Sequence, residues 1–270
     1  MRNTVGMLAA ALVLLIALPG YGQAESEFPK KYGLEFQLGG GYYMMDDVND
    51  FIPHAALGLY EPDKIHIGSQ FGFAILYRQW WNKGNPLHNF GWQIGWNRLL
   101  TGVPVALEEK YYISAYLPTA PTDESWAEQT VVGSEVYALA TWYGNFGSNE
   151  VMLGIGPALY YATLDRSVDI VQDPGSHLTA GSFADAGGKA LGLLVEAGLE
   201  MPMTPDLFLV VKGGGRLAKV GKLTYEDNQG VEQTVWIGGN ATLPVDFTGG
   251  FFRVGLRTYF KPTSDWRTPK

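Results

Sequence analysis

The side chains that most often do chemistry in exported proteins are few in this sequence. Its histidines are His54, His66, His88 and His177, and it contains no cysteine. An esterase-like site needs a serine that hydrogen-bonds to a histidine. His66 and Ser69 are close together in "HIGSQ", but their odd spacing places them on opposite faces of a strand. We therefore assign no catalytic residue to this pair.

Two other groups could do chemistry. Asp173, Ser176 and His177 occur together in "DPGSHLT", in an expected loop, where such combinations are common and carry little catalytic information. No G-x-S-x-G elbow accompanies them. The aspartates of "MMDDVND" (44–50) could hold calcium weakly, but a solvated acidic loop is the simpler interpretation. We predict that the protein is not an enzyme and holds no metal or cofactor.

Nine other charged residues share a clearer pattern, because each lies in an alternating segment on the parity opposite to the apolar residues. In "FFRVGLRTYF" (251–260), for example, Arg253 and Arg257 alternate with Val254 and Leu256. The nine are Glu35, Arg78, Glu135, Glu196, Glu200, Lys212, Arg216, Arg253 and Arg257. Four acids nearly balance five bases. An enclosed lumen needs such a balance, since an unpaired buried charge costs several kcal/mol.

The segments that would position these charges all read as β-strands, because apolar residues recur at every second position. Eight segments show this alternation: 33–44, 66–81, 89–98, 131–144, 150–164, 189–201, 206–217 and 251–260. No region after residue 24 shows a sustained helical period. The sequence therefore predicts an all-β fold.

The connections between these segments alternate in length. Three are tight turns rich in Gly, Pro, Asn and Asp, namely "NKGNPLH", "NFGSN" and "PMTPD". The other four are long, at roughly 45–65, 100–130, 165–188 and 218–247. Short turns at one end and long loops at the other are typical of an antiparallel up-and-down transmembrane β-barrel. "YYISAYL" (111–117) and "TVWIGG" (234–239) would extend strands beyond the membrane and could raise the strand count from eight to ten.

Aromatic residues and one proline add further predictions. Aromatic residues gather at both ends of the expected strands, which predicts two interfacial girdles. One girdle would hold Trp80, Trp81, Trp142, Tyr143, Tyr259 and Phe260, and the other Tyr42, Tyr43, Tyr160 and Tyr161. Pro157 lies within a strand and removes a hydrogen-bond donor, which predicts a β-bulge there.

The two ends of the chain and its net charge bound the compartment. Residues 1–24 hold one arginine, a short apolar run and a small-residue cleavage site, which predicts a signal peptide cleaved after Ala24. Residues 25–260 would form the barrel and 261–270 a short periplasmic tail. The chain has 19 basic and 27 acidic residues, a formal net charge of −8. This charge excludes nucleic acid as a favoured partner.

With these segments, the chain resembles the small bacterial outer-membrane barrels of the OmpA, OmpX and OmpW type. "RVGLRTYF" is similar to the terminal assembly signal of such proteins, although "KPTSDWRTPK" follows it. The resemblance implies the cell outer membrane, with lipid, lipopolysaccharide and the barrel assembly machinery as partners. It leaves open a structural or surface role, or a narrow porin-like passage for a small solute. The alternatives are a barrel enzyme acting on envelope lipid and a secreted, soluble β-sandwich binding protein.

Overall fold

The structure is a computed structural model that describes residues 31–50, 67–80, 89–100, 109–113, 125–173, 176–178, 182–238 and 241–260. Eight long strands build its wall: β1 (Tyr32–Tyr42), β2 (Ile67–Trp80), β3 (Asn89–Leu100), β5 (Ser125–Phe146), β6 (Asn149–Asp173), β8 (Phe183–Pro202), β9 (Leu207–Leu217) and β16 (Gly249–Phe260). Five of them match the predicted segments to within about two residues, whereas β5, β6 and β8 extend into regions predicted to be long loops. The predicted signal peptide and tail lie outside the described residues.

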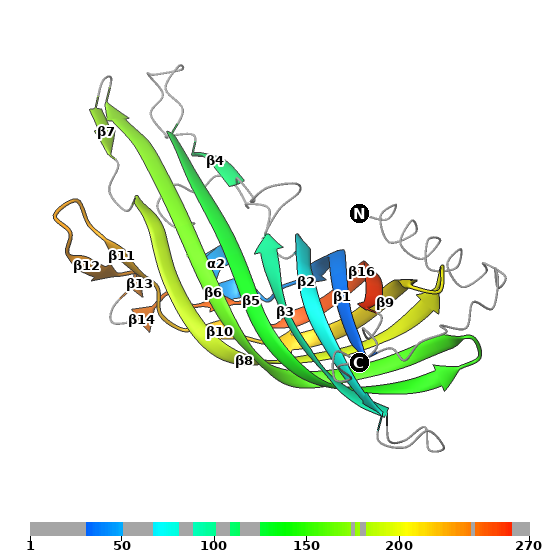
Figure 1. The fold of residues 1–270 in the computed structure, drawn as a ribbon. Helices are drawn as coiled ribbons and strands as arrows, with labels where there is room; N and C mark the ends of the chain where they lie inside the picture. The colour runs from blue at the N-terminus through cyan, green and yellow to red at the C-terminus, as the bar shows by residue number, and fades with distance from the viewer. Residues whose placement is uncertain are drawn as a thin grey trace, which may run out of the picture.

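These eight strands close into one barrel (Figure 1). Each pairs antiparallel with the next along the chain, and β16 returns to pair with β1. The predicted eight-stranded, antiparallel up-and-down barrel is therefore confirmed. The alternative of a soluble β-sandwich is wrong, because the wall is a single closed sheet rather than two packed ones.

The wall is much taller on one side than on the other (Figure 1). β5, β6 and β8 have 22, 25 and 20 residues, whereas β1 and β9 have 11 each. About ten residues suffice for a strand to cross a membrane, so the three long strands project beyond the others. We call the end toward which they project, which also holds the long connections, the external end. We call the opposite end, with the short turns, the periplasmic end, which is the orientation that the sequence predicts.

Short strands widen this projection into an external sheet. β4 (Glu109–Ile113) pairs with β5, β7 (Ser176–Leu178) with β6, and β11 (Thr224–Glu226) with both β8 and β12 (Glu232–Thr234). The described parts of the two segments, 111–113 and 234–238, thus add no wall strand, and the wall has eight strands rather than ten. Two further pairs, β10 (Lys219–Val220) with β15 (Val245–Asp246) and β13 (Trp236–Gly238) with β14 (Ala241–Thr242), form small separate sheets.

Side chains alternate strictly across the wall, as the sequence predicted. On β1, Phe36 and Leu38 point outward and are 62% and 69% exposed, whereas Glu35 and Gln37 point inward and are buried. The same outward apolar surface continues over every long strand, for example at Ile75, Trp92, Ile155, Leu191 and Leu256. α2 (Asp46–Asp50) is a single short turn of helix. Among the described residues, no helix is long and apolar enough to cross a membrane.

The prediction of two aromatic girdles is confirmed for some of the named residues and wrong for others. Tyr42, Tyr161 and Phe260 point outward and are about half exposed. Tyr43, Tyr143, Tyr160 and Tyr259 instead point inward and are 3% exposed or less. The physical reason is the strand period of two, because neighbouring aromatic residues must point to opposite faces. One member of each pair therefore fills the interior.

The predicted bulge at Pro157 is wrong. Its side chain is exposed on the outer face of β6. The partners of Tyr137 and Ala140, on either side of it, keep one register. A proline removes one donor without adding a residue, so the ladder loses a hydrogen bond but does not shift. The register shifts on this strand lie nearer the external end, between Leu164 and Arg166 against β8 and between Val171 and Asp173 against β7.

Candidate functional site

All nine charged residues predicted to face the lumen lie inside the barrel. Each is 2% exposed or less: Glu35, Arg78, Glu135, Glu196, Glu200, Lys212, Arg216, Arg253 and Arg257. Strand alternation carries them inward from β1, β2, β5, β8, β9 and β16. Together with polar neighbours they form a layer, here the charged layer, that crosses the lumen in its periplasmic and central part.

The charged layer begins near the periplasmic end with Arg257. Its Nε donates to Glu35 Oε2 at 3.0 Å and its Nη1 to Glu200 Oε2 at 2.6 Å. Tyr259 donates its hydroxyl to the same Glu200 oxygen at 2.8 Å. Glu35 is the direct cross-strand partner of Arg257, whereas Glu200 reaches it past β9. One guanidinium therefore joins three strands.

A tenth charge completes the layer and was missed from the sequence. Glu150, at the periplasmic end of β6, accepts a hydrogen bond from Arg78 Nη1 at 2.7 Å. The Arg78 guanidinium also lies over the Tyr143 ring, 4.1 Å from its centroid. Glu150 has the inward parity of β6, so alternation alone could have found it. Its addition makes five acids and five bases.

Lys212 links the periplasmic and central parts of the layer. Its Nζ lies 2.8 Å from Glu35 Oε1, 3.1 Å from Glu196 Oε1 and 3.3 Å from Gln93 Oε1. These contacts come from three other strands, β1, β8 and β3. An ammonium group has three N–H donors, and here each has an oxygen within reach.

Glu135 is at the centre of the part of the charged layer that lies nearer the external end. Arg253 donates to its Oε1, Asn97 Nδ2 does so at 2.5 Å, and Arg216 Nη1 lies 3.4 Å from its Oε2. Gln70 Oε1 accepts from Arg216 at 2.9 Å and from Arg253 at 3.1 Å. These neutral partners, Gln70 on β2 and Asn97 on β3, occupy buried inward positions of the wall.

Inward glycines make room for large neighbours rather than leaving a channel. A Cβ added to Gly95 would lie 2.4 Å from the Tyr137 ring. One added to Gly214 would lie 2.6 Å from the Phe251 ring. At these positions the space is taken by aromatic rings.

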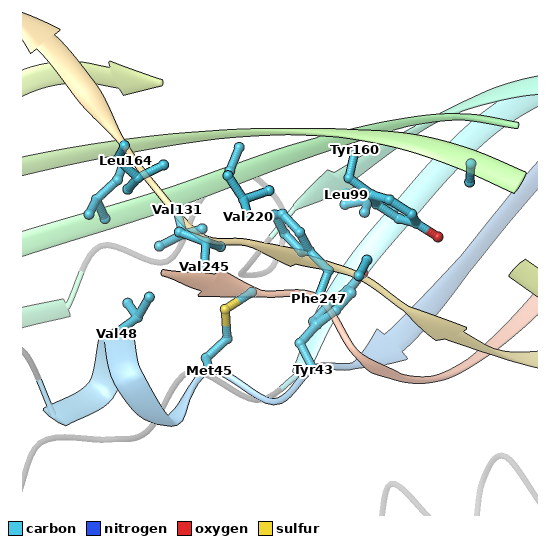
Figure 2. Close-up of a cluster of buried hydrophobic side chains, with 14 of the residues drawn as sticks. Tyr43, Met45, Val48, Leu99, Val131, Tyr160, Leu164, Val220, Val245 and Phe247 are labelled. Atoms are coloured by element: carbon cyan, nitrogen blue, oxygen red, sulfur yellow. The ribbon is translucent and has the colours of Figure 1, made fainter. Parts of the chain in front are cut away.

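The external half of the lumen is filled by apolar side chains instead. The connection between β9 and β16 (218–248) is here called the plug segment. Its residues 218–223, Val235 and 243–248 pack inside the barrel, whereas β11 and β12 belong to the external sheet. Figure 2 shows part of the cluster that it forms with the wall and with residues next to α2. The plug segment contributes Ala218, Val220, Leu223, Val235, Leu243, Val245 and Phe247, each 3% exposed or less.

Phe247 holds the plug segment against the wall. Its ring lies 6.0 Å from the Tyr43 ring in an edge contact and 6.3 Å from the Tyr160 ring in a stacked one (Figure 2). Gly133 of β5 leaves the space for it, because a Cβ there would lie 2.6 Å from Phe247 Cζ. The Phe247 N–H donates to Ala218 O at 2.8 Å, which closes the segment on itself.

Aromatic rings separate the two layers. The Arg216 guanidinium lies 4.9 Å from the Phe251 ring centroid and 5.3 Å from that of Tyr43. The Arg253 guanidinium lies 4.0 Å from the Phe251 ring centroid. These rings therefore form the boundary between the charged layer on their periplasmic side and the apolar cluster on their external side.

None of the histidines and acidic groups that the sequence offered as candidates for chemistry can be assigned to a site among the described residues. His54, His66 and His88 lie outside the described residues, as do the side chains of 173–178. Asp47 forms an ion pair with Lys219 of the plug segment at 2.8 Å. Among the described residues, no group of histidine, aspartate and glutamate side chains could hold a metal ion.

Comparisons with solved structures return bacterial outer-membrane proteins at low identity. No protein-family model and no curated protein matches the chain. A major outer membrane protein from Thermus thermophilus is 15% identical, with 85% of this chain and 99% of that chain covered and a TM-score of 0.45. OprG from Pseudomonas aeruginosa is 9% identical, with 88% of this chain and 100% of that chain covered and a TM-score of 0.44. The outer membrane protease OmpT from Escherichia coli is 12% identical, with 88% of this chain and 100% of that chain covered and a TM-score of 0.43.

Proposed function

We propose that this chain is an outer-membrane β-barrel closed along its axis, whose role is structural or at the cell surface. It would act through the external sheet and the segments that the barrel holds there. It would reach the membrane after cleavage of a signal peptide behind Ala24 and with the help of the barrel assembly machinery.

The observation that carries this proposal is the filling of the lumen by two different layers. The charged layer spans the barrel with ion pairs such as Arg257–Glu200 and Arg253–Glu135. The plug segment and Tyr43 then fill the external half with apolar side chains. A solute moving along the axis would have to break several buried ion pairs and displace a packed cluster. This arrangement disfavours the narrow-passage alternative.

The interior also argues against catalysis there. A catalytic acid or base must be able to exchange its proton with a substrate. Glu35, Glu135, Glu196 and Glu200 are each held by lysine or arginine within the packed layer. They therefore act as structural partners of the cations, and the proposal assigns the lumen no catalytic role.

The membrane part of the proposal is tested by gel mobility of the purified outer-membrane fraction, unboiled against boiled. A closed barrel resists unfolding by detergent, so the unboiled band should migrate faster and shift on heating. Recovery in the soluble periplasmic fraction, with no shift, would contradict the proposal.

The closure is tested by conductance in planar bilayers. The full-length protein should give no channel steps. A variant in which residues 219–247 are replaced by a short glycine–serine linker keeps the charged layer and removes the plug segment. If this variant conducts, the plug segment is the seal, and if it stays silent, the charged layer suffices. Regular steps from the full-length protein would instead favour the narrow passage.

A further inference from the structure

Lys212 and Gln93 meet inside the lumen from opposite sides of the barrel. Lys212 is on β9 and Gln93 is on β3, and three wall strands separate β9 from β3 in either direction around the ring. Lys212 Nζ nevertheless lies 3.3 Å from Gln93 Oε1. Both residues are 1% exposed or less. The fold therefore holds an amine and a carboxamide together in a place that water does not reach.

Glu196 of β8 is a proton acceptor for this amine. Its Oε1 lies 3.1 Å from Lys212 Nζ, and its Oε2 lies 3.8 Å from Arg253 Nη1. Within the described residues, neither oxygen accepts a hydrogen bond of good geometry. Glu35, the other carboxylate near Nζ, accepts two hydrogen bonds from Arg257 at its Oε2. Glu196 is therefore the carboxylate with more capacity to take a proton from Lys212.

The Gln93 side chain is oriented for attack at its carboxamide carbon. An ammonium group can only donate hydrogen bonds, so the atom that faces Lys212 is the oxygen. The nitrogen, Nε2, donates to the Tyr137 hydroxyl at 3.1 Å. Since a C=O bond is about 1.2 Å long, Lys212 Nζ lies within about 4.5 Å of the carboxamide carbon. Attack needs a separation of about 3–3.5 Å, which a rotation about the last bonds of the lysine side chain supplies.

We propose that Lys212 and Gln93 form an intramolecular isopeptide bond. Lys212 first passes one ammonium proton to Glu196, a transfer that replaces two buried ions by two neutral groups. The free amine then attacks the Gln93 carboxamide carbon, so that the Nζ–Cδ bond forms and the Cδ–Nε2 bond breaks. A second proton moves from Nζ to Nε2, which leaves as ammonia. The reaction occurs once in each molecule and has no external substrate.

The charges of the lumen stay balanced in the product. Before the reaction, the charged layer holds five acids and five bases. Afterwards Lys212 is an uncharged amide and Glu196 keeps the transferred proton, which leaves four of each. Glu35, the second carboxylate beside Lys212, keeps its ion pair with Arg257. The product thus avoids the cost of an uncompensated buried charge.

The bond would brace the barrel across its axis. The backbone ladder joins only neighbouring strands, and a chain without cysteine cannot form a disulfide across the lumen. A covalent link between residues 93 and 212 closes a long loop and so restricts the unfolded chain. The bond is independent of the membrane placement proposed above, because these side chains meet inside the barrel wherever it lies. Lys212 as a permanent ammonium ion would make the same contacts, but without any loss of mass.

Intact mass spectrometry of the purified full chain, after unfolding and with its N-terminus established, tests the bond. Loss of ammonia should make the unaltered protein about 17 Da lighter than its sequence requires. Lys212→Arg should have its full mass, and Glu196→Gln should leave most molecules at full mass because the proton acceptor is gone. The matched control, Lys219→Arg, makes the same change at a half-exposed lysine of the plug segment and should keep the deficit.

Tryptic digestion then locates the bond. It should yield one linked species that contains both Gln93 and Lys212, with no cleavage after Lys212. After boiling, the unaltered protein should migrate faster than Lys212→Arg, because an internal loop keeps the unfolded chain compact. An unaltered protein of full mass, or a deficit that persists in Lys212→Arg, would overturn the isopeptide bond.

The heat-induced gel shift keeps this test separate from the proposed function. A variant that keeps the shift is folded, so its mass can be compared with that of the unaltered protein. If a variant loses the shift, the mass and the linked peptide of the unaltered protein still decide. An unaltered protein with the shift but no deficit overturns the isopeptide bond alone, and one with the deficit but no shift overturns the membrane barrel alone.

Discussion

Arg257 Nη1 lies 2.6 Å from Glu200 Oε2, although β9 separates the strands that carry them. The same guanidinium also contacts Glu35, its direct neighbour on β1. This pair therefore ties β16 to β8 across the intervening strand β9, through side chains inside the lumen rather than through the backbone ladder. Removing one partner leaves a buried charge that the packed interior cannot hydrate.

Arg257→Met should lower the free energy of unfolding by about 3–5 kcal/mol, because Glu35 and Glu200 lose their shared cation. Adding Glu200→Gln to that variant should recover part of the loss, since one uncompensated carboxylate disappears. Urea unfolding in lipid vesicles, followed by tryptophan fluorescence, measures both. Lys222→Met is the control and should stay within about 0.5 kcal/mol. A loss for Arg257→Met no larger than that would show that the pairing does not stabilise the barrel.

Gly133→Ala should loosen the plug segment. Its new Cβ would lie 2.6 Å from Phe247 Cζ and 3.2 Å from Leu99 Cβ, so the Phe247 ring must move within a packed cluster. Overpacking of this kind typically costs about 1–3 kcal/mol. Hydrogen exchange should then become faster in 218–248 while β1 and β2 stay protected. Phe247→Leu in the same chain should restore part of the protection, and its failure to do so would mean that the two residues are not coupled.

The ion pair between Lys219 and Asp47 should matter much less than those of the charged layer. Its side chains are 51% and 39% exposed, so Lys219→Met should cost less than about 1 kcal/mol. The hydrogen bond to Asp47 raises the pKa of Lys219 above its ordinary 10.5. This contribution is therefore complete below pH 10.5 and is lost as the pH rises through the higher folded-state value. Unfolding curves at low and high salt should show a smaller cost at high salt, and a cost comparable to that of Arg257→Met would contradict the screening argument.

The β11–β12 hairpin should respond to acid through Asp227. The backbone N–H of Val231, the Gln233 side chain and the backbone N–H of Gln229 all donate to its carboxylate, which lowers its pKa below the ordinary 3.8. Because the folded-state pKa is lowered, the added order is present above pH 3.8 and is lost as the pH falls through the folded value. Amide chemical shifts of Gln229 and Val231 should thus stay constant from about pH 7 to 5 and change below about pH 3.8. Asp227→Ala should abolish that transition, and its persistence would assign it to another group.

Alternation along each strand carried most of the prediction. Residues such as Arg253 and Arg257 could be placed inside because a period of two leaves no other choice once the apolar side is known. The errors arose where residues were placed by their position along a strand and not by their parity. Tyr43 and Tyr259 were assigned to girdles by their position along the strand, although their parity points inward. Glu150 was overlooked at a strand end, where the alternating pattern is shortest.

The sequence by itself determined the eight strands, their order and which face of each is polar, because these depend on neighbouring residues along one strand. It could not determine that Glu200 meets Arg257 past β9, or that Gly133 receives the ring of Phe247. Those contacts join residues far apart in the chain, and they depend on register and closure of the whole barrel. The filling of the external lumen by the plug segment was likewise decided by tertiary structure. In the sequence this segment is a long connection, and its apolar side chains, such as Leu243, Val245 and Phe247, gain a partner only when the wall is present to receive them.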